Sequence, residues 1–507
     1  MVGVEPVLGS YRNICVQSQL MFDVGQQPQL SDLHFRLSDH LVPEWGDPRL
    51  ELGGVYYWGV RSTVVMIIDR EENPFGFFLG IPIDYGNRTV IRDCIVYDKN
   101  DYSCGTESDS LERWLFEFGG RWLAVVAWNG IKRVYTDTNA TIGLVFDTEG
   151  GVAASAASVL LSKEAYSRLL RYDLLRRLDV ANAGWLMSGL TAHEGVERLL
   201  ANHYLDLNSW VQRRHWPKPH SIRHSIGVEK SLQRIAAIVS EHIETLVANG
   251  RVACALTAGC ETRLLLACSK GLVNSIDFIT VAFSGAGNDV HIASDLAAQR
   301  ELKHCVLPMR HANETQITEW FYNGGHCVGG ILSREHPSVA SLSSYDFFIG
   351  GLGGEVARGF FYRQSDTGEE RLSGRELVAR AGLPSEPTVV QATEKWLRNT
   401  PQLSAPELLD LAYVELRMGP WAFASSYANQ YTTEIHPLVC RESYELIFGL
   451  PYECKRGNPL LEIIEMLDPS LLEIPINRYG SVRDQVVLLS KLMQPKRVAK
   501  KIRKLFG

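Results

Sequence analysis

Alternating helical and strand patterns between residues 228 and 308 restrict the fold of this chain more than any other feature. Apolar side chains at Val228, Leu232, Ile235 and Val239 fall on one helical face. Apolar strand runs and further helical patterns then follow one another at 252–256, 263–270, 275–283, 289–302 and 304–308. Such alternation predicts a parallel, doubly wound α/β sheet, whose ligands bind beyond the carboxyl ends of the strands.

The residues before this region are rich in strand patterns. β-Branched and aromatic runs at 62–71, 75–83 and 121–137 predict strands, and Asn129-Gly130 predicts a hairpin within the last run. A second hairpin is expected over 203–216, and a helix over 163–178. Residues 217–225 read PKPHSIRHS, a composition typical of a linker. We therefore expect two domains, 1–216 and 229–507, joined by a linker at 217–228.

Charge and cysteine content narrow the functional classes. The net charge of -7 and the absence of a basic domain speak against nucleic acid as a partner. The ten cysteines are scattered without a C-x-x-C pair, which favours reduced thiols, and no apolar run has the length of a membrane span, so we expect a cytoplasmic protein. Residues 491–507 hold seven Lys or Arg, which suit a solvated helix, an anionic membrane surface or an acidic partner.

A turn of small residues follows the strand that ends at Leu256. Ala258 and Gly259 let a ligand approach the free N–H groups at the start of the next helix, which is an arrangement suited to phosphate. The hydroxyls of Thr257 and Thr262 add donors. A carboxylate in the same turn could hold a divalent cation. The alternative is a tight strand-to-helix turn that binds no ligand.

A second glycine-rich loop follows another strand run, at 345–349. It reads GGLGGE and contains Gly350, Gly351, Gly353 and Gly354, followed by Glu355. Two such loops at strand ends, each with one carboxylate, are what a cleft for a nucleotide and its metal requires. The alternative is a flexible surface loop.

In these two loops the chain resembles the asparagine synthetase family, whose nucleotide site has an S-G-G-x-D-S loop and a later G-x-G-x-D-E loop. Residues 257–262 align with the first and 350–355 with the second, and the likeness covers most of the chain, strongly from about Gly119 onward and weakly before it. The resemblance implies an N-terminal αββα glutaminase-like domain. It also implies a C-terminal ATP-pyrophosphatase domain of the PP-loop type (adenine nucleotide alpha hydrolase-like), with a helical C-terminal part.

The resemblance further implies ATP and Mg²⁺ as cofactors. It gives Glu261, Glu355 and Arg263 catalytic roles, and Glu261 and Glu355 the role of metal ligands. The residues implied in nucleotide binding are Leu256, Thr257, Ala258, Gly259, Cys260, Thr262, Gly350, Gly351, Gly353 and Gly354.

Several positions depart from the family pattern. The chain begins Met1-Val2-Gly3 and therefore lacks the N-terminal cysteine nucleophile, so we predict no glutaminase activity. Glu261 stands where the family has aspartate, and Gly354 replaces a second aspartate. The family's later lysine has no clear counterpart, although Lys455 and Arg456 lie near its place.

Two hypotheses follow. The first is an ATP-dependent amide ligase that adenylates a small-molecule carboxylate, for example a sugar acid, releases pyrophosphate, and takes nitrogen from ammonia, from a partner that supplies ammonia, or from an amine. The second is a pseudoenzyme that keeps the fold as a nucleotide-binding or scaffolding partner. The oligomeric state stays open, a homo-oligomer included.

Overall fold

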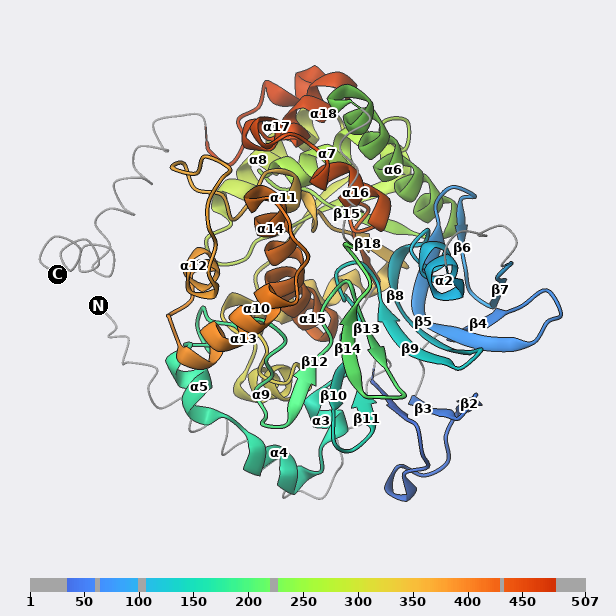
Figure 1. The fold of residues 1–507 in the computed structure, drawn as a ribbon. Helices are drawn as coiled ribbons and strands as arrows, with labels where there is room; N and C mark the ends of the chain where they lie inside the picture. Colours follow the sequence, from blue (N-terminus) through green and yellow to red (C-terminus); the bar gives the residue numbers. More distant parts are fainter. Residues whose placement is uncertain (1–33, 60–63, 99–105, 219–226, 429–432, 480–507) are drawn as a thin grey trace, which may run out of the picture.

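The computed structural model describes residues 34–59, 64–98, 106–218, 227–428 and 433–479. The chain start, most of the predicted linker and the basic segment 491–507 lie outside the described residues. The described part is an α/β structure with three sheets (Figure 1).

The first sheet contains six strands, whose bounds are β1 (Phe35–Ser38), β2 (Leu50–Leu52), β3 (Val55–Gly59), β10 (Val145–Asp147), β11 (Val152–Ala154) and β12 (Val196–Arg198). Their order is β12-β10-β11-β1-β3-β2, and all neighbours are antiparallel.

The second sheet is mixed. Its strands are β4 (Val64–Ile68), β5 (Pro74–Asp84), β6 (Thr89–Val90), β7 (Cys94–Val96), β8 (Gly119–Trp128), β9 (Ile131–Thr136), β13 (His203–Asp206) and β14 (Val211–Arg214). The order is β14-β13-β9-β8-β5-β4-β7 with β6 beside β5, and only the β4–β7 pair is parallel among the described strands. Asn129-Gly130 joins β8 to β9 and residues 207–210 join β13 to β14, so both predicted hairpins are confirmed.

The first two sheets pack face to face. Leu37 and Tyr57 of the six-stranded sheet share a core with Leu123 and Val125 of the mixed sheet. Side chains alternate between the faces of a strand, so the other face of the mixed sheet carries a separate core. That core lies against α2 (Glu107–Leu115) and includes Trp122.

The third sheet is parallel and contains β15 (Val252–Ala255), β16 (Ile276–Val281), β17 (His304–Leu307), β18 (Phe347–Ile349) and β19 (Thr433–Ile435). Its order is β17-β16-β15-β18-β19. The chain therefore builds one side of the sheet outward from β15 and then returns to add β18 on the other side. The alternation in the sequence predicted this parallel, doubly wound arrangement correctly.

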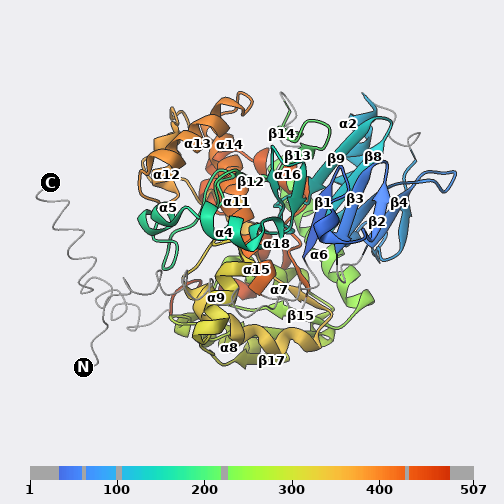
Figure 2. The same cartoon turned by 90° about the horizontal axis from the view of Figure 1, so that it is seen from below.

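The helices around the parallel sheet follow the predicted periodicity. They are α6 (Val228–Asn249), α7 (Cys260–Cys268) and α8 (Gly287–Gln299). Helix α7 begins three residues earlier than expected, so the small-residue turn is itself the helix N-terminus, with Gly259 as the N-cap. Figure 2 shows α7, α8 and the strands β15 and β17 together on the side opposite α12–α14.

The later part of the described chain is mostly helical, as predicted. Its helices are α9 (Glu314–Asn323), α10 (Ile331–Glu335), α11 (Gly354–Ala357), α12 (Gly374–Arg380), α13 (Pro387–Arg398), α14 (Ala405–Ala412), α15 (Gly419–Ala428), α16 (Arg441–Phe448), α17 (Tyr452–Gly457) and α18 (Pro459–Leu467). A π-helix at Tyr413–Met418 connects α14 to α15.

One predicted helix is wrong in its extent. Residues 163–178 form α4 (Lys163–Leu169) and α5 (Tyr172–Arg177), which are separated at Leu170 and Arg171. Leu170 pairs with His193 as an isolated antiparallel bridge, and the N–H of Arg171 donates to the carbonyl of Ala192 at 2.7 Å. These tertiary hydrogen bonds replace helical ones, so the local periodicity was overridden.

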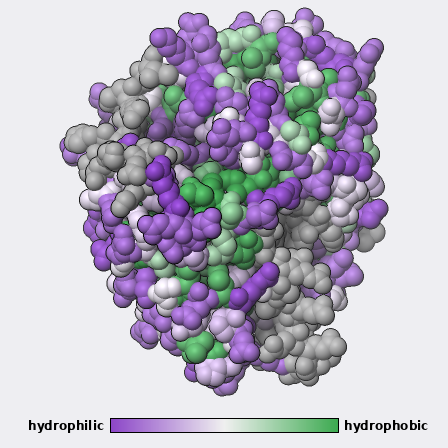
Figure 3. All heavy atoms as spheres, turned by 90° about the vertical axis from the view of Figure 1, so that its right-hand side faces the viewer, coloured by the Kyte–Doolittle hydropathy of each residue, from purple (hydrophilic) through white to green (hydrophobic). Residues whose placement is uncertain are grey.

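The two halves of the chain share one large hydrophobic core. It joins Ile83 and Trp216 of the first half to Ile235 of α6, Leu264 of α7 and Ile463 of α18. Among the described residues, no helix combines the length and apolar composition needed to cross a bilayer. Figure 3 shows apolar side chains in a band across the side that lies on the right in Figure 1. Val96 of β7 is 50% exposed.

Candidate functional site

The loop after β15 is held by its own polar groups. The N–H of Thr257 donates to Oγ1 of Thr262 at 3.0 Å, and the N–H of Gly259 donates to Oγ1 of Thr257 at 3.2 Å. Asp289 at the start of α8 accepts from the N–H of Ala258 at 3.0 Å. These three donors are therefore used inside the protein. The first-turn N–H groups of α7 have no intrahelical partner, which is the arrangement that binds anions at a helix N-terminus.

Those first-turn groups belong to Cys260, Glu261 and Thr262. Leu256 and Ala258 are buried and serve packing. A Cβ atom on Gly259 would lie 3.1 Å from Oε2 of Glu261, so a side chain there would press on this carboxylate. Burial raises the pKa of the Cys260 thiol to about 11, so this side chain is a neutral part of the wall.

The structure brings the second glycine-rich loop against the first. Strands β15 and β18 are neighbours, with Cys254 opposite Ile349, so the loops that follow them leave the sheet side by side. A Cβ atom on Gly351 would lie 2.8 Å from Cβ of Glu261, and one on Gly354 would lie 2.5 Å from its Cγ. Glycine at these two positions is therefore what allows the loops to touch.

Two carboxylates lie where the loops meet. Glu261 accepts from Nε of Arg358 at 2.7 Å, in an ion pair whose side chains are 14% and 34% exposed. Glu355 has a buried Oε2 atom with no hydrogen-bond partner among the described residues. Burial raises the pKa of Glu355, and the nearby charge of Glu261 raises it further.

The arrangement of these two carboxylates suits the binding of one divalent cation. A cation would offset the repulsion between them and would satisfy the Oε2 atom of Glu355. No group of three or more His, Cys, Asp or Glu suited to a metal occurs among the described residues. Mg²⁺ is commonly held by one or two carboxylates together with substrate phosphates and water.

Arg263 lies apart from this pair. Its side chain is fully buried, and its terminal nitrogens donate to the carbonyls of Leu471, Ile474 and Pro475. Burial lowers its pKa to about 10. The donors that the predicted catalytic role requires are thus used to hold the segment after α18, and Arg358 is the arginine that reaches the carboxylates.

Lys455 and Arg456 also lie apart from the loops. Nζ of Lys455 donates to Oδ2 of Asp410 at 2.7 Å, and both side chains are 1% exposed. Asn458 and Leu460, further along, do contact the site. The amide of Asn458 lies 3.5 Å from Sγ of Cys260, and Leu460 lies beside Gly354.

Sequence reasoning missed two residues at β19, the other neighbour of β18: Glu434 within the strand and His436 directly after it. Gly350 donates its N–H to the carbonyl of Ile435 at 3.0 Å, and a Cβ atom on Gly350 would lie 2.7 Å from the His436 ring. Nε2 of His436 lies 3.7 Å from Oε1 of Glu434. Because β19 has only three residues, its sequence gave no strand signal that would have directed attention to them.

A cavity of about 510 Å³ opens next to the first loop, at the carboxyl ends of β15 and β16. Its walls are largely apolar and include Ile279, Val281 and Phe348. Thr257, Asp289 and Glu434 supply polar groups, besides Ser284 and His336. A cavity of this size with few polar groups is typical of a small-ligand site, and its apolar walls suit a planar base.

No protein-family model and no curated protein sequence matches the chain. Among solved structures it is similar to NAD+ synthetase from Burkholderia pseudomallei, at 15% identity, over 41% of this chain and 89% of that chain, with a TM-score of 0.18. A TM-score this low does not establish a shared fold, so the described topology stands on its own. Membership of the asparagine synthetase family stays a prediction.

Proposed function

We propose that the protein is an ATP-dependent amide ligase that adenylates a carboxylate, releases pyrophosphate and transfers the acyl group to ammonia or an amine. The carboxylate is a small molecule such as a sugar acid. The observation that carries the proposal is the contact between two glycine-rich loops at the carboxyl edge of neighbouring parallel strands, beside an apolar cavity.

In this proposal each part of the site has one role. The cavity holds the base and ribose, with Phe348 and Val281 against the base. The first-turn N–H groups of α7 bind the departing pyrophosphate, because the positive end of the helix dipole stabilises that charge. Arg358 lies near enough to Glu261 to reach the same phosphates when the ion pair opens.

Glu261 and Glu355 hold Mg²⁺ in this scheme. When bound, Mg²⁺ supplies charge stabilisation for the phosphates. Glu355 must lose its proton to serve as a ligand, and its raised pKa means that the metal competes with that proton.

A second candidate is a nucleotide-binding protein without catalysis. The specific observation in its favour is the ion pair between Arg358 and Glu261, which already occupies one of the two carboxylates proposed as metal ligands. Such a protein would bind ATP and release no pyrophosphate.

The decisive experiment measures ATP binding by calorimetry and pyrophosphate release with Mg²⁺ and a panel of carboxylates. We expect binding with release, and loss of release in Glu355→Gln. Glu164→Gln, an exposed acid on α4, is the matched control and should behave as the natural protein does. Binding without release from any carboxylate would favour the second candidate, and no ATP binding would contradict both.

A further inference from the structure

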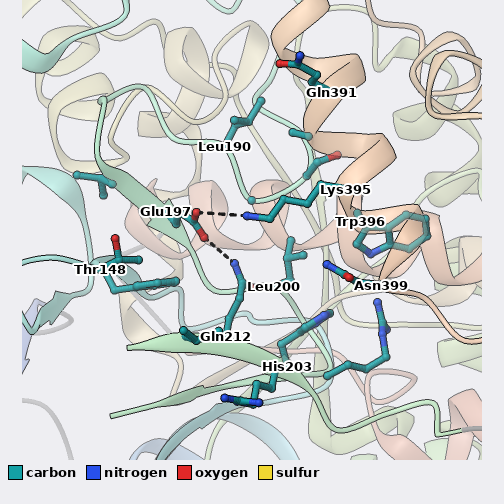
Figure 4. Close-up of a pocket in the computed structure, with 18 of the residues that line it drawn as sticks. Thr148, Leu190, Glu197, Leu200, His203, Gln212, Gln391, Lys395, Trp396 and Asn399 are labelled. Atoms are coloured by element: carbon teal, nitrogen blue, oxygen red, sulfur yellow. Dashed lines mark hydrogen bonds and ion pairs between the residues drawn. The ribbon is translucent and has the colours of Figure 1, made fainter. Parts of the chain in front are cut away.

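A second and larger cavity, of about 1050 Å³, lies away from the two loops. Residues of β12, β14 and α13 line it, so the cavity lies where the first half of the chain meets the helical part (Figure 4). Figure 4 shows Lys395 of α13 facing Glu197 of β12, which also faces Gln212 of β14.

The walls of this cavity are strongly basic. They contain five cationic side chains and one carboxylate, in a protein whose net charge is -7. Glu197 lies 3.8 Å from Nζ of Lys395 and accepts from the amide of Gln212 at 3.1 Å. Arg171, Arg213 and Arg398 have no ion-pair partner among the described residues, so their charge is available to an anionic ligand.

The base of the cavity is built from buried polar contacts. Nη2 of Arg214 donates to Oε2 of Glu415 at 2.8 Å, and the indole N–H of Trp396 donates to the same oxygen at 2.7 Å. Glu415 is 1% exposed. This network fixes β14 against α13, so the cavity has a preformed shape.

Strand β14 gives the cavity a backbone edge. It is the last strand of the mixed sheet among the described residues, and all four of its residues, Val211–Arg214, line the cavity. An edge strand directs unpaired backbone N–H and C=O groups outward, where an extended peptide can pair with them. Val211 is 48% exposed, so the edge is not closed by its own side chains.

We propose that this cavity binds an extended acidic segment of a partner polypeptide, which pairs with β14 and places its carboxylates against Lys395 and Arg398. A lone phosphate would fill little of the volume, and the cations are spread over three elements rather than gathered at one point. An extended chain meets both conditions, because alternate side chains face the same wall. This proposal does not depend on the ligase activity.

The test is calorimetric titration of the full-length protein with a capped octapeptide of alternating glutamate and threonine. We expect binding that weakens as salt rises, because the charges are partly exposed. Lys395→Glu combined with Arg398→Glu should weaken binding by about tenfold or more, since each reversal sets like charges together. Arg176→Glu, an exposed arginine of α5 outside the cavity, should leave it unchanged.

Three comparison ligands make the result decisive. The same peptide with lysine for glutamate should fail to bind, and so should the glutamate peptide with N-methylated backbone, which cannot pair with a strand. Equal binding of either one would overturn the proposal, as would a peptide affinity that the double reversal leaves unchanged. Displacement of the peptide by an equal concentration of inorganic pyrophosphate would show a small-anion site instead.

Discussion

The carboxylate of Glu355 lies where burial and a neighbouring charge both oppose its ionisation. Its Oε2 atom is buried and has no hydrogen-bond partner among the described residues, and Glu261 lies beside it. An uncompensated group of this kind is costly unless a ligand supplies what is missing. A divalent cation is the simplest such ligand, which makes the pH dependence of metal binding informative.

We predict that the affinity for Mg²⁺–ATP falls as the pH is lowered. The pKa of Glu355 is raised, so the group takes up a proton at a higher pH than an ordinary glutamate and then cannot bind the metal. In Glu355→Gln the affinity should be low and nearly independent of pH. Calorimetry between pH 5 and pH 8 measures the affinity of the natural protein and of the variant. An equally steep pH dependence of the affinity in the variant would assign that dependence to another group.

Gly354 offers a second test at the residue scale. A methyl group in Gly354→Ala would lie 2.5 Å from Cγ of Glu261, so we expect a loss of about 1–3 kcal/mol in the free energy of unfolding. Glu261→Ala removes the Cγ atom. The loss in the double variant should therefore be smaller than the sum of the losses in the two single variants, as measured by denaturant unfolding. Additive losses would mean that the loops do not touch.

At the scale of elements, a buried ion pair joins α14 to α17. Lys455 of α17 contacts Asp410 of α14, and the hydroxyl of Tyr362 donates to the same carboxylate at 3.1 Å. Removing one partner of such a pair leaves a buried charge, which costs more than the pair contributes.

We predict that Lys455→Met lowers the free energy of unfolding by about 3–5 kcal/mol, and that Asp410→Asn added to it restores part of the loss. Thermal or denaturant unfolding measures both variants. A loss below about 1 kcal/mol in the single variant would indicate that water reaches Asp410.

The elements with strong local signals could be predicted from the sequence. The hairpins at Asn129-Gly130 and 207–210 and the α/β alternation depend on side-chain periods of two and 3.6, which a single sequence displays. The break at Leu170 could not be predicted, because its partner His193 is brought there by tertiary structure.

In the candidate site, too, some features could be predicted from the sequence and others could not. The two glycine-rich loops were visible because small residues at strand ends have a local meaning. The position of Arg263 depends on carbonyls more than 200 residues later in the chain, and that of Arg358 on contact between the loops. Such distant partners leave no trace in a local pattern, so neither the carbonyl contacts of Arg263 nor the ion pair of Arg358 could be predicted.

At the scale of the whole molecule, several buried histidines connect stability to pH. Burial lowers the pKa of His203, His242 and His326 to about 4 in each case. These groups stay neutral in the folded protein at pH values where the unfolded chain binds protons. Above about pH 6.5 these histidines therefore have no effect on the pH dependence of the free energy of unfolding. As the pH falls towards 4, they lower that free energy.

We predict that the free energy of unfolding decreases between pH 6.5 and pH 4, by up to about 1.4 kcal/mol per pH unit for each such histidine. Urea unfolding at several pH values measures the slope. His242→Leu should flatten the slope by one histidine's share, whatever its effect on stability at pH 7. His291→Gln, a partly exposed control on α8, should leave the slope unchanged, and an unaltered slope in His242→Leu would contradict the assignment.

The central place of β15 in the parallel sheet has a consequence for biosynthesis. During translation β16 and β17 can join β15 as soon as they leave the ribosome, but the strand on its other side, β18, is made only some forty residues after Leu307. A nascent chain that stops before Phe347 therefore has the first glycine-rich loop but not the second. If the two loops bind a nucleotide as we propose, that site is complete only after residues 350–355 have been synthesised.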